Sequence, residues 1–181
     1  MQYQTDAEIL GMIRKDESRD QGFNLLIVKY QQRVYVLVRR LVYIHSDADD
    51  ITQEIFIKVY EKIDQFREES GLFTWIYRIA INEALTFLKK KKRRALMFTE
   101  ASQDLAGTLN EDPLFDGDEL QRKLIEAVDK LPPRQKIVFN MKYFEEMKYK
   151  EISRVLDLSV GALKTSYHHA VRKITKYVTL D

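Results

Sequence analysis

The sequence predicts an all-α protein in which two small helical domains are joined by an acidic, flexible linker. Apolar residues recur at the 3.6-residue period of a helix through most of the chain. Only 6 Gly and 3 Pro occur among 181 residues, too few for the many turns of a sheet-rich fold. Residues 1–95 hold 17 Lys+Arg and 14 Asp+Glu, residues 96–118 hold 6 Asp+Glu and no Lys or Arg, and residues 119–181 hold 13 Lys+Arg and 8 Asp+Glu. Two basic blocks around an acidic one predict domains at 1–95 and 119–181 and a linker at 96–118.

The composition excludes several classes of protein. There is no cysteine, so disulfides, thiol catalysis and cysteine zinc sites are excluded. No stretch approaches the roughly 18 continuous apolar residues of a membrane-spanning helix, and the first residues lack the apolar run of a signal peptide. The chain contains no glycine-rich phosphate loop and no HExxH motif. We therefore expect a protein that is not an enzyme and that uses no cofactor. The absence of cysteine permits a reducing compartment, and a cytoplasmic location is the expectation compatible with it.

The first two helices are predicted from capping signals and apolar periods. Thr5 and Glu8 form a capping box that starts a short helix ending near Lys15. Asp20 is the predicted N-cap of a longer helix that runs to about Tyr43. The apolar stripe of this helix consists of Phe23, Leu26, Ile27, Tyr30, Val34, Leu37, Val38 and Leu41. Three arginines are expected outside the stripe, on a solvated face: Arg33, Arg39 and Arg40.

A third helix is predicted to begin at the acidic segment 46–50, because acidic side chains in a first turn complement the helix dipole. Its core stripe has the spacing i, i+4, i+8 and i+12 and consists of Ile51, Ile55, Val59 and Ile63. A mixed polar face lies away from this stripe and consists of Asp50, Gln53, Glu54 and Lys58. Such a face suits reversible docking on another helix through charge complementarity.

The stretch 66–94 predicts a polar loop followed by one long helix, with Ser70 as the candidate N-cap. The apolar positions at helical spacing are Leu72, Trp75, Ile76, Ile79 and Ala80. The other side carries Thr74, Arg78, Asn82, Glu83, Thr86 and Lys89. The helix ends in six successive cations, residues 89–94. Cations attract phosphate, and aromatic and amide groups can hold an unstacked base, but an ordinary amphipathic helix with a dipole-complementing basic end has the same pattern.

Residues 96–118 lose the helical period and collect Gly, Asn, Asp, Ser and Pro. At about 3.3 Å per extended residue, such a linker could reach roughly 70 Å. A helix is then predicted from Glu119 to Lys130, and the segment Leu131-Pro132-Pro133 should break it. Pro133 fits the first turn of the next helix, where proline is tolerated.

The C-terminal part has the outline of a helix-turn-helix, in which a short turn joins the segments KYKEISRVL and SVGALKTSYHHAVRKITKYV. Ser159 is the predicted cap of the second helix. The apolar stripe of the second helix is Val160, Leu163, Tyr167, Ala170, Val171, Ile174 and Val178. The opposite side carries Gly161, Thr165, His168 and Arg172, flanked by Lys164, His169, Thr175 and Lys176. Residues 159–178 contain four Lys/Arg and no acid, so this face suits the major groove of DNA. Adjacent histidines point about 100° apart on a helix, so no metal site is expected.

These motifs resemble a known family. The strings DADDITQEIFIKVY and F-x5-LFTWIYRIAINEA resemble region 2 of bacterial sigma-70-family initiation factors, in the small two-domain extracytoplasmic-function (ECF) class. The pattern LP-x-R-Q…F…EIS-x-VL-x-LS-x-G-x-[LV]-K resembles sigma region 4. The region 2 and region 4 motifs occur in the same order as in the family, and together they cover nearly the whole chain. The sequence departs from the region 4 pattern at Ala162, Ser166 and His169, where Thr, Arg and Arg are common, which leaves the −35 sequence open.

The resemblance implies a factor that binds core RNA polymerase and directs it to −10 and −35 promoter elements. Binding to the largest polymerase subunit is implied for Asp50, Gln53, Glu54 and Lys58, and the second-largest subunit is a further expected contact. The melted −10 strand is implied to meet Phe66, Arg78, Asn82, Thr86, Lys89 and Arg93, with Phe66 and Asn82 lining a pocket for a flipped-out base. The −35 duplex is implied to meet Lys164, Thr165, His168, His169 and Arg172, of which His169 and Arg172 contact the backbone.

Several interpretations stay open beside this one. Phe66 is either a base-stacking ring or a core side chain, whereas Trp75 is expected in the core. The acidic linker either enters a polymerase channel, as in the family, or is a plain tether. An anti-sigma factor, in many cases membrane-bound, is the expected regulator. The alternative function is a dimeric helix-turn-helix regulator that binds duplex operators without polymerase, although no leucine-rich pairing helix supports it.

Overall fold

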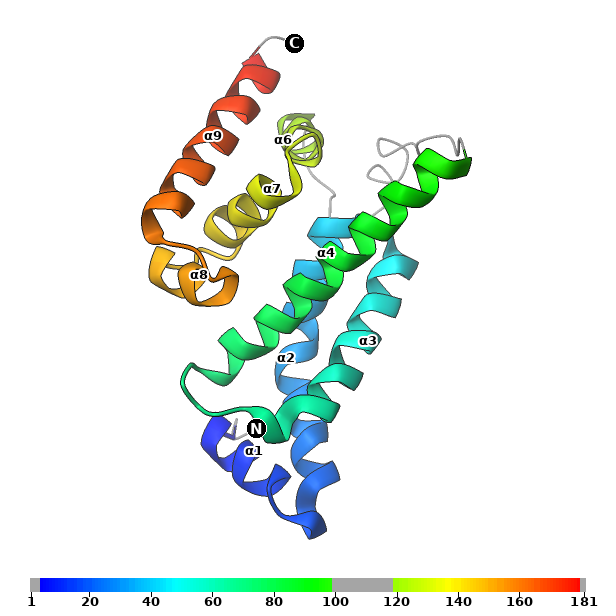
Figure 1. Cartoon of the computed structure of the whole chain (residues 1–181), viewed down its shortest axis with the longest axis vertical. Coiled ribbons are helices and arrows are strands. Elements are labelled where there is room, and N and C mark those ends of the chain that lie inside the picture. The colour runs from blue at the N-terminus through cyan, green and yellow to red at the C-terminus, as the bar shows by residue number, and fades with distance from the viewer. Residues whose placement is uncertain (1–3, 99–118, 180–181) are drawn as a thin grey trace.

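The computed structural model describes residues 4–98 and 119–179, and every regular element in these two ranges is helical (Figure 1). The first part contains α1 Asp6–Ile13, α2 Arg19–Val42, α3 His45–Lys62 and α4 Leu72–Phe98, with 3-10 turns η1 Asp16–Ser18 and η2 Ile63–Gln65. The second part contains α6 Glu119–Asp129, α7 Pro133–Phe139, the π-helical turn η4 Asn140–Phe144, α8 Tyr149–Leu156 and α9 Val160–Thr179. The prediction of an all-α, two-part chain is confirmed. The predicted linker lies outside the described residues from Thr99 onward, and α4 continues to Phe98.

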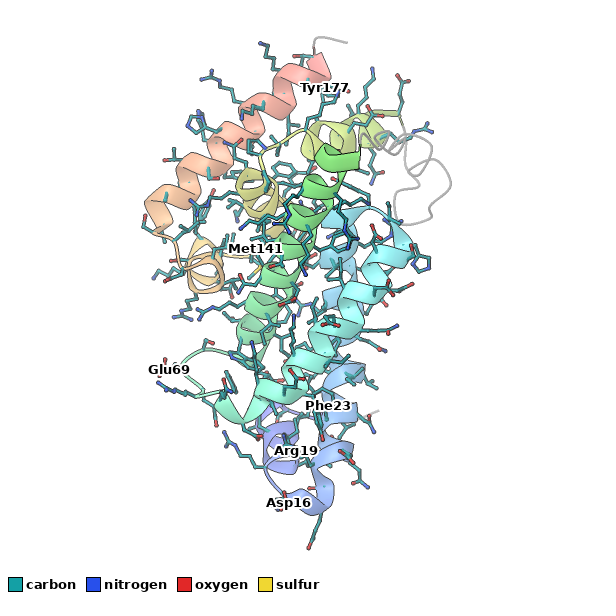
Figure 2. The ribbon with its side chains drawn as sticks, turned by 45° about the vertical axis from the view of Figure 1, so that its right-hand side comes forward. Asp16, Arg19, Phe23, Glu69, Met141 and Tyr177 are labelled. Atoms are coloured by element: carbon teal, nitrogen blue, oxygen red, sulfur yellow. The ribbon has the colours of Figure 1, made fainter. Side chains whose placement is uncertain are left out.

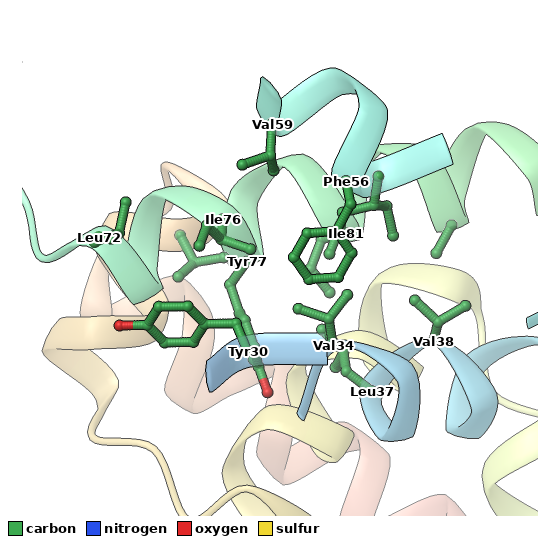
Figure 3. Close-up of a cluster of buried hydrophobic side chains, with 14 of the residues drawn as sticks. Tyr30, Val34, Leu37, Val38, Phe56, Val59, Leu72, Ile76, Tyr77 and Ile81 are labelled. Carbon is green, nitrogen blue, oxygen red and sulfur yellow. The ribbon is translucent and has the colours of Figure 1, made fainter. Parts of the chain in front are cut away.

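Helices α2, α3 and α4 form the core of the first domain by facing their apolar stripes inward (Figure 3). The predicted stripe of α3 is confirmed, since all four of its members are buried: Ile51, Ile55, Val59 and Ile63. The capping box at the start of α1 is also confirmed. The Thr5 amide donates to the Glu8 carboxylate at 2.7 Å, and the Glu8 amide donates to the Thr5 hydroxyl at 3.3 Å.

The second domain packs α6, α7 and α9 around a small core of its own. Its buried members are Ala127, Val128, Leu131, Phe139, Ala170 and Ile174. The Phe139 ring stacks on Tyr143 at 5.0 Å and on Tyr167 at 5.8 Å between centroids. Pro133 is the first residue of α7, as predicted. Val171, placed in the apolar stripe by its spacing, is instead 37% exposed.

Two predicted helix starts are wrong by a residue or two. Helix α4 begins at Leu72, and the Trp75 amide donates to the carbonyl of Gly71 at 3.2 Å, so Ser70 is not its cap. Helix α2 begins at Arg19, which places Asp20 in its first turn. The displacement of Asp20 changes little, because a carboxylate stabilises a helix from the first turn as well as from the cap.

The expectation of a solvated arginine face on α2 is wrong for Arg39, which is 1% exposed. Burial lowers the pKa of Arg39, while the hydroxyl of Tyr35 and the carboxylate of Asp49 partly offset this effect. Arg40 is half-buried and pairs with Glu145 of the second domain. Arg33 is exposed as expected, with its guanidinium 3.9 Å from the centre of the Phe73 ring. Helix α2 therefore packs against other parts of the protein not only along its apolar stripe but also on the side that carries Arg39 and Arg40.

The two domains share one continuous apolar cluster. Second-domain side chains in it are Ile137, Val138, Met141, Met147, Ile152, Val155 and Leu163. Met141 is fully buried in this cluster, and Figure 2 shows it beside α4. Helix α4 thus carries α2 and α3 on one side and α8 on another (Figure 1).

Glycine at position 22 is required by the close approach of α1 to α2. A Cβ atom there would lie 2.8 Å from Met12 Cβ and 2.9 Å from the backbone nitrogen of Ile13. We expect Gly22→Ala to lower the free energy of unfolding by about 1–3 kcal/mol, because the backbone must move. Gly11→Ala is the matched control, since nothing lies within 4 Å of its Cβ position. The control should stabilise the helix by up to about 1 kcal/mol, and urea titration of both variants would measure the difference.

Candidate nucleic-acid and protein interfaces

The exposed face of α3 is apolar at its centre and polar at its edges. At 100° per residue, Asp50, Gln53 and Glu54 lie within about 120° of rotation, and all three are exposed. Ile57, which is 54% exposed, lies at the centre of the same face, and the 39% exposed Tyr60 lies at its edge. An exposed apolar centre with a polar rim is typical of a protein docking surface.

Sequence reasoning missed Ile57 and Tyr60, and it missed the partners that Lys58 has within the chain. Lys58 is half-buried and donates to Glu83 of α4, with Glu54 at 4.0 Å, so it braces two helices from the edge of the α3 face. The signal for Ile57 was available, because it is an isoleucine outside the i, i+4 core stripe. A groove of about 420 Å³ between α2 and α3 adjoins Gln53.

The loop before α4 forms a cavity of about 250 Å³. It is lined by Gln65, Phe66, Arg67, Glu69, Ser70, Trp75, Arg78 and Arg154. Phe66 is 7% exposed, and its ring centre lies 5.4 Å from that of Trp75. Phe66 is thus a packed side chain that also forms a wall of the cavity, so the two interpretations of this residue are compatible. Trp75 is half-buried at the edge of the core rather than inside it.

A polar ridge follows α4 away from this cavity. The residues Arg78, Asn82, Thr86, Lys89 and Arg93 are all exposed, and at 100° per residue they lie within about 80° of rotation. The Thr86 hydroxyl donates to the Asn82 carbonyl at 2.8 Å. Asn82 lies in a second groove of about 660 Å³ and not in the Phe66 cavity, while Arg78 borders both. The structure therefore does not bring Phe66 and Asn82 into one pocket, because Phe66 lies in the loop before α4 whereas Asn82 lies well inside that helix.

The loop that carries Phe66 is braced by the N-terminal segment. Arg19 donates to both carboxylate oxygens of Asp64, at 3.0 and 2.9 Å, and Arg14 pairs with Glu68. Its hydrogen bonds from Arg19 lower the pKa of Asp64. Figure 2 shows Arg19 at the base of the first domain, where this segment lies. Glu68 has a left-handed φ of 58°, a conformation that non-glycine residues adopt only when the surroundings hold them in it.

The helix-turn-helix prediction is confirmed in its geometry. The turn between α8 and α9 has Asp157 at a left-handed φ of 53°, and the Ser153 hydroxyl donates to the Leu158 carbonyl at 2.6 Å. Ser159 caps α9, since its hydroxyl accepts from the Ala162 amide at 3.2 Å. The predicted outward residues of α9 are all exposed: Lys164, Thr165, His168, His169 and Arg172. The rings of His168 and His169 diverge, with centroids 6.1 Å apart.

Within residues 4–98 and 119–179, no group of three His, Asp or Glu side chains is arranged to hold a metal ion. In the same ranges, no helix is long and apolar enough to cross a membrane.

Comparisons with known proteins agree with this arrangement. Residues 26–94 match the family model described as Sigma-70 region 2, and residues 121–174 match Sigma-70, region 4. The ECF RNA polymerase sigma-E factor of Escherichia coli (strain K12) is 31% identical over 184 residues, covering 96% of this chain and 94% of that protein. The RNA polymerase sigma-H factor of Pseudomonas aeruginosa is 28% identical over 180 residues, with coverages of 94% and 92%.

Two solved structures share the fold. One is the sigma factor RpoE in complex with the anti-sigma factor NepR from Bartonella quintana, with a TM-score of 0.67, 17% identity and coverages of 88% and 98%. The other is CnrH in complex with the cytosolic domain of CnrY, with a TM-score of 0.66, 19% identity and coverages of 97% and 95%. With both family regions matched and a 31% identical relative covered almost end to end, the chain belongs to the sigma-70 family, in its ECF class, and is a transcription initiation factor of RNA polymerase rather than an enzyme.

Proposed function

We propose that the two domains divide the reading of a promoter between them. The first domain binds core RNA polymerase through the exposed face of α3 and reads the melted −10 strand through the Phe66 cavity and the α4 ridge. The second domain reads the −35 duplex by placing α9 in the major groove. The proposed domain limits remain 1–95 and 119–181, with the acidic linker 96–118 between them.

Helix α4 supplies the observation that carries this proposal. One helix joins a cavity with an aromatic wall to a line of exposed amide, hydroxyl and cationic side chains that ends in Arg93. A single strand needs such a combination, because its bases can enter a cavity or stack while its phosphates need cations. On α9, the outward side chains near the helix start suit base edges, and later cations suit phosphates.

The proposed partners include an anti-sigma factor. RpoE and CnrH, which share this fold, were each solved in complex with such a factor or its cytosolic domain. A regulator with a cytosolic domain would meet this chain in the cytoplasm, where we place its action with polymerase. Run-off transcription with purified core polymerase and genomic fragments tests the function directly. A gel shift on duplex DNA without polymerase tests the alternative of a free operator-binding dimer.

The α9 face predicts selective loss of −35 recognition. We expect Lys164→Ala with His168→Ala to reduce discrimination between −35 sequences roughly tenfold or more, because each good base contact contributes about 1–3 kcal/mol. Binding to core polymerase should be unchanged, as measured by fluorescence anisotropy. Lys173→Ala is the control, since Lys173 donates to Gln135 of its own domain at 3.1 Å. Loss of core binding in the double variant would contradict the assignment.

The α3 face predicts selective loss of polymerase binding. We expect Gln53→Ala with Glu54→Ala to weaken core binding several-fold, and Ile57→Ser to weaken it further because the apolar centre is lost. The circular dichroism spectrum should not change, since these side chains are exposed. Lys62→Ala, at the end of the same helix, should bind as the wild type does. If the variant that combines all three substitutions bound core polymerase as tightly as the wild type, the assignment of the α3 face to polymerase binding would be wrong.

The brace beneath the loop predicts an effect on −10 choice. Arg19→Ala should reduce discrimination between −10 sequences by a factor of about two to five, because an exposed ion pair stabilises a loop only weakly. Exchange of the pair, Arg19→Asp with Asp64→Arg, should restore part of the discrimination. Transcription from promoters that differ only in the −10 element measures the ratio. Equal ratios in wild type and Arg19→Ala would show that the brace does not position the loop.

A further inference from the structure

Two histidines form a large part of the outward face of α9. Of the five side chains proposed to meet the −35 duplex, Lys164 and Arg172 carry a fixed positive charge and Thr165 is neutral. The other two are His168 and His169. Because histidine changes its charge between about pH 5 and pH 8, these five side chains carry two positive charges when both rings are neutral and four when both are protonated. Half of the largest charge on this face therefore depends on bound protons.

Both histidines lie among cations on the helix surface. At 100° per residue, His168 lies between Lys164 and Arg172, whereas Arg172 and Lys173 follow His169 at the spacings i+3 and i+4. Both rings are exposed, and their planes are inclined at 59° to each other. Since the rings diverge, they can meet different groups of a duplex rather than the same one.

The helices packed against α9 supply no carboxylate partner for these rings in the described ranges 4–98 and 119–179. Three helices pack on it, α6, α7 and α8. Their charged side chains are Glu119, Arg122, Lys123, Glu126 and Asp129 of α6, Arg134 and Lys136 of α7, and Lys150, Glu151 and Arg154 of α8. The acids among them have other partners, namely Lys123 for Glu119, the Tyr177 hydroxyl for Glu126, Lys136 for Asp129 and the Lys148 amide for Glu151.

The closest preceding acid along the chain is Asp157, in the turn before α9. His168 follows it by 11 residues, which corresponds to roughly 16 Å along a helix axis at about 1.5 Å per residue. Charges in water are largely screened beyond about 8 Å at physiological salt, and residues 159–178 contain no acid. A counter-charge for either ring therefore has to come from a binding partner, and a DNA duplex presents phosphates.

A phosphate beside either ring favours its protonated form, because an opposite charge within about 4–6 Å stabilises the charged state of a titratable group. The complex then holds more protons than the separate protein and duplex. By linkage, binding that takes up protons becomes stronger as the pH falls and weaker as the pH rises. The range in which this matters is the range in which histidine titrates, about pH 5 to pH 8.

We infer that the second domain takes up protons at His168 and His169 when it binds duplex DNA, so that its affinity for DNA falls as the pH rises through neutrality. The inference rests on the proposed −35 role of α9. It adds to that role a response to acidity that does not require a particular base sequence, since phosphate contacts carry no sequence information directly.

The histidine content of the chain allows a direct test. The chain contains 3 His and no Cys, so His45 is the third side chain of the type that titrates near neutral pH. Full-length protein is mixed at low salt, without polymerase, with a short fluorescent DNA duplex of randomised sequence. Fluorescence anisotropy then measures the affinity near pH 6 and near pH 8. His45→Gln is the matched control, since His45 lies at the start of α3, where it contacts Tyr35 and Asp49.

We expect the wild type to bind roughly tenfold more tightly near pH 6 than near pH 8, because protonated rings add phosphate contacts. His168→Gln with His169→Gln should show the weaker affinity at both pH values, and His168→Lys with His169→Lys should show the stronger affinity at both. His45→Gln should keep the wild-type ratio. The wild-type dependence of log affinity on log salt should be steeper near pH 6, by about 0.9 for each histidine that meets a phosphate.

The pH ratio decides the outcome. A ratio near one in the wild type, the wild-type ratio in the double glutamine variant, or loss of the ratio in His45→Gln would each overturn the inference. Calorimetry in two buffers that differ in their heat of ionisation counts the protons directly. About one to two should be taken up by the wild type and almost none by the double glutamine variant. Because both rings are exposed, the circular dichroism spectra of all variants should match.

Run-off transcription separates this inference from the proposed function. If the wild type starts transcripts with core polymerase but its duplex affinity does not depend on pH through these histidines, only the inference fails. If the wild type starts no transcript on any template, the proposed function fails, whereas the pH ratio still reports whether the histidines take up protons on DNA.

Discussion

The burial of α4 between two sets of helices is the constraint on which the rest of the structure depends. Six of its side chains are at most 2% exposed: Leu72, Ile76, Tyr77, Ala80, Ile81 and Ala84. At 100° per residue they cover about half of the helix circumference. Each large apolar side chain buried in this way contributes about 1.5–3 kcal/mol, so the position of α4 is strongly determined. The polar ridge from Arg78 to Arg93 lies on the other half of the helix.

This burial also sets where charge can be placed. Arg39 is buried and interacts with Tyr35 and Asp49 of the first domain, whereas Arg40, one position later, pairs with Glu145 of the second domain. Charged groups this far from water need partners, since an unpaired buried charge costs several kcal/mol. The partners here come from distant parts of the chain, with Arg40 and Glu145 separated by 105 positions. The arrangement of the domains and the pairing of these charges are therefore linked.

The surfaces assigned to partners differ in how firmly the fold holds them. The outward residues of α9 belong to a helix with a clear cap and a tight turn before it, so their direction follows from local geometry. The Phe66 loop has no such local framework. It depends on ion pairs from Arg14, which directly follows α1, and from Arg19, the first residue of α2. Helix α1 packs closely on α2 at Gly22. A reading surface built on a loop is thus supported by residues far from it in sequence.

Much of the fold could be predicted from the sequence because its signals are local. A capping box, the i, i+4 stripe of α3, Pro133 at a helix start and Ser159 as a cap each act within a few residues, and each is present in the structure. The candidate site could be predicted less well. Exposure of Gln53 and Lys164 follows from periodicity, but Lys58 is turned toward Glu83, and Asn82 lies outside the Phe66 cavity.

The sequence by itself determined the helices, their apolar stripes, the two-part charge pattern and the family motifs, because these depend on neighbours along the chain. Only the tertiary structure decided that Arg39 is buried, that Tyr77 bonds to Glu145, and that Arg78 contacts the second domain. Those outcomes depend on how one domain packs on another. A periodic pattern shows which side of a helix is polar, but the packing of a distant helix decides whether that side meets water.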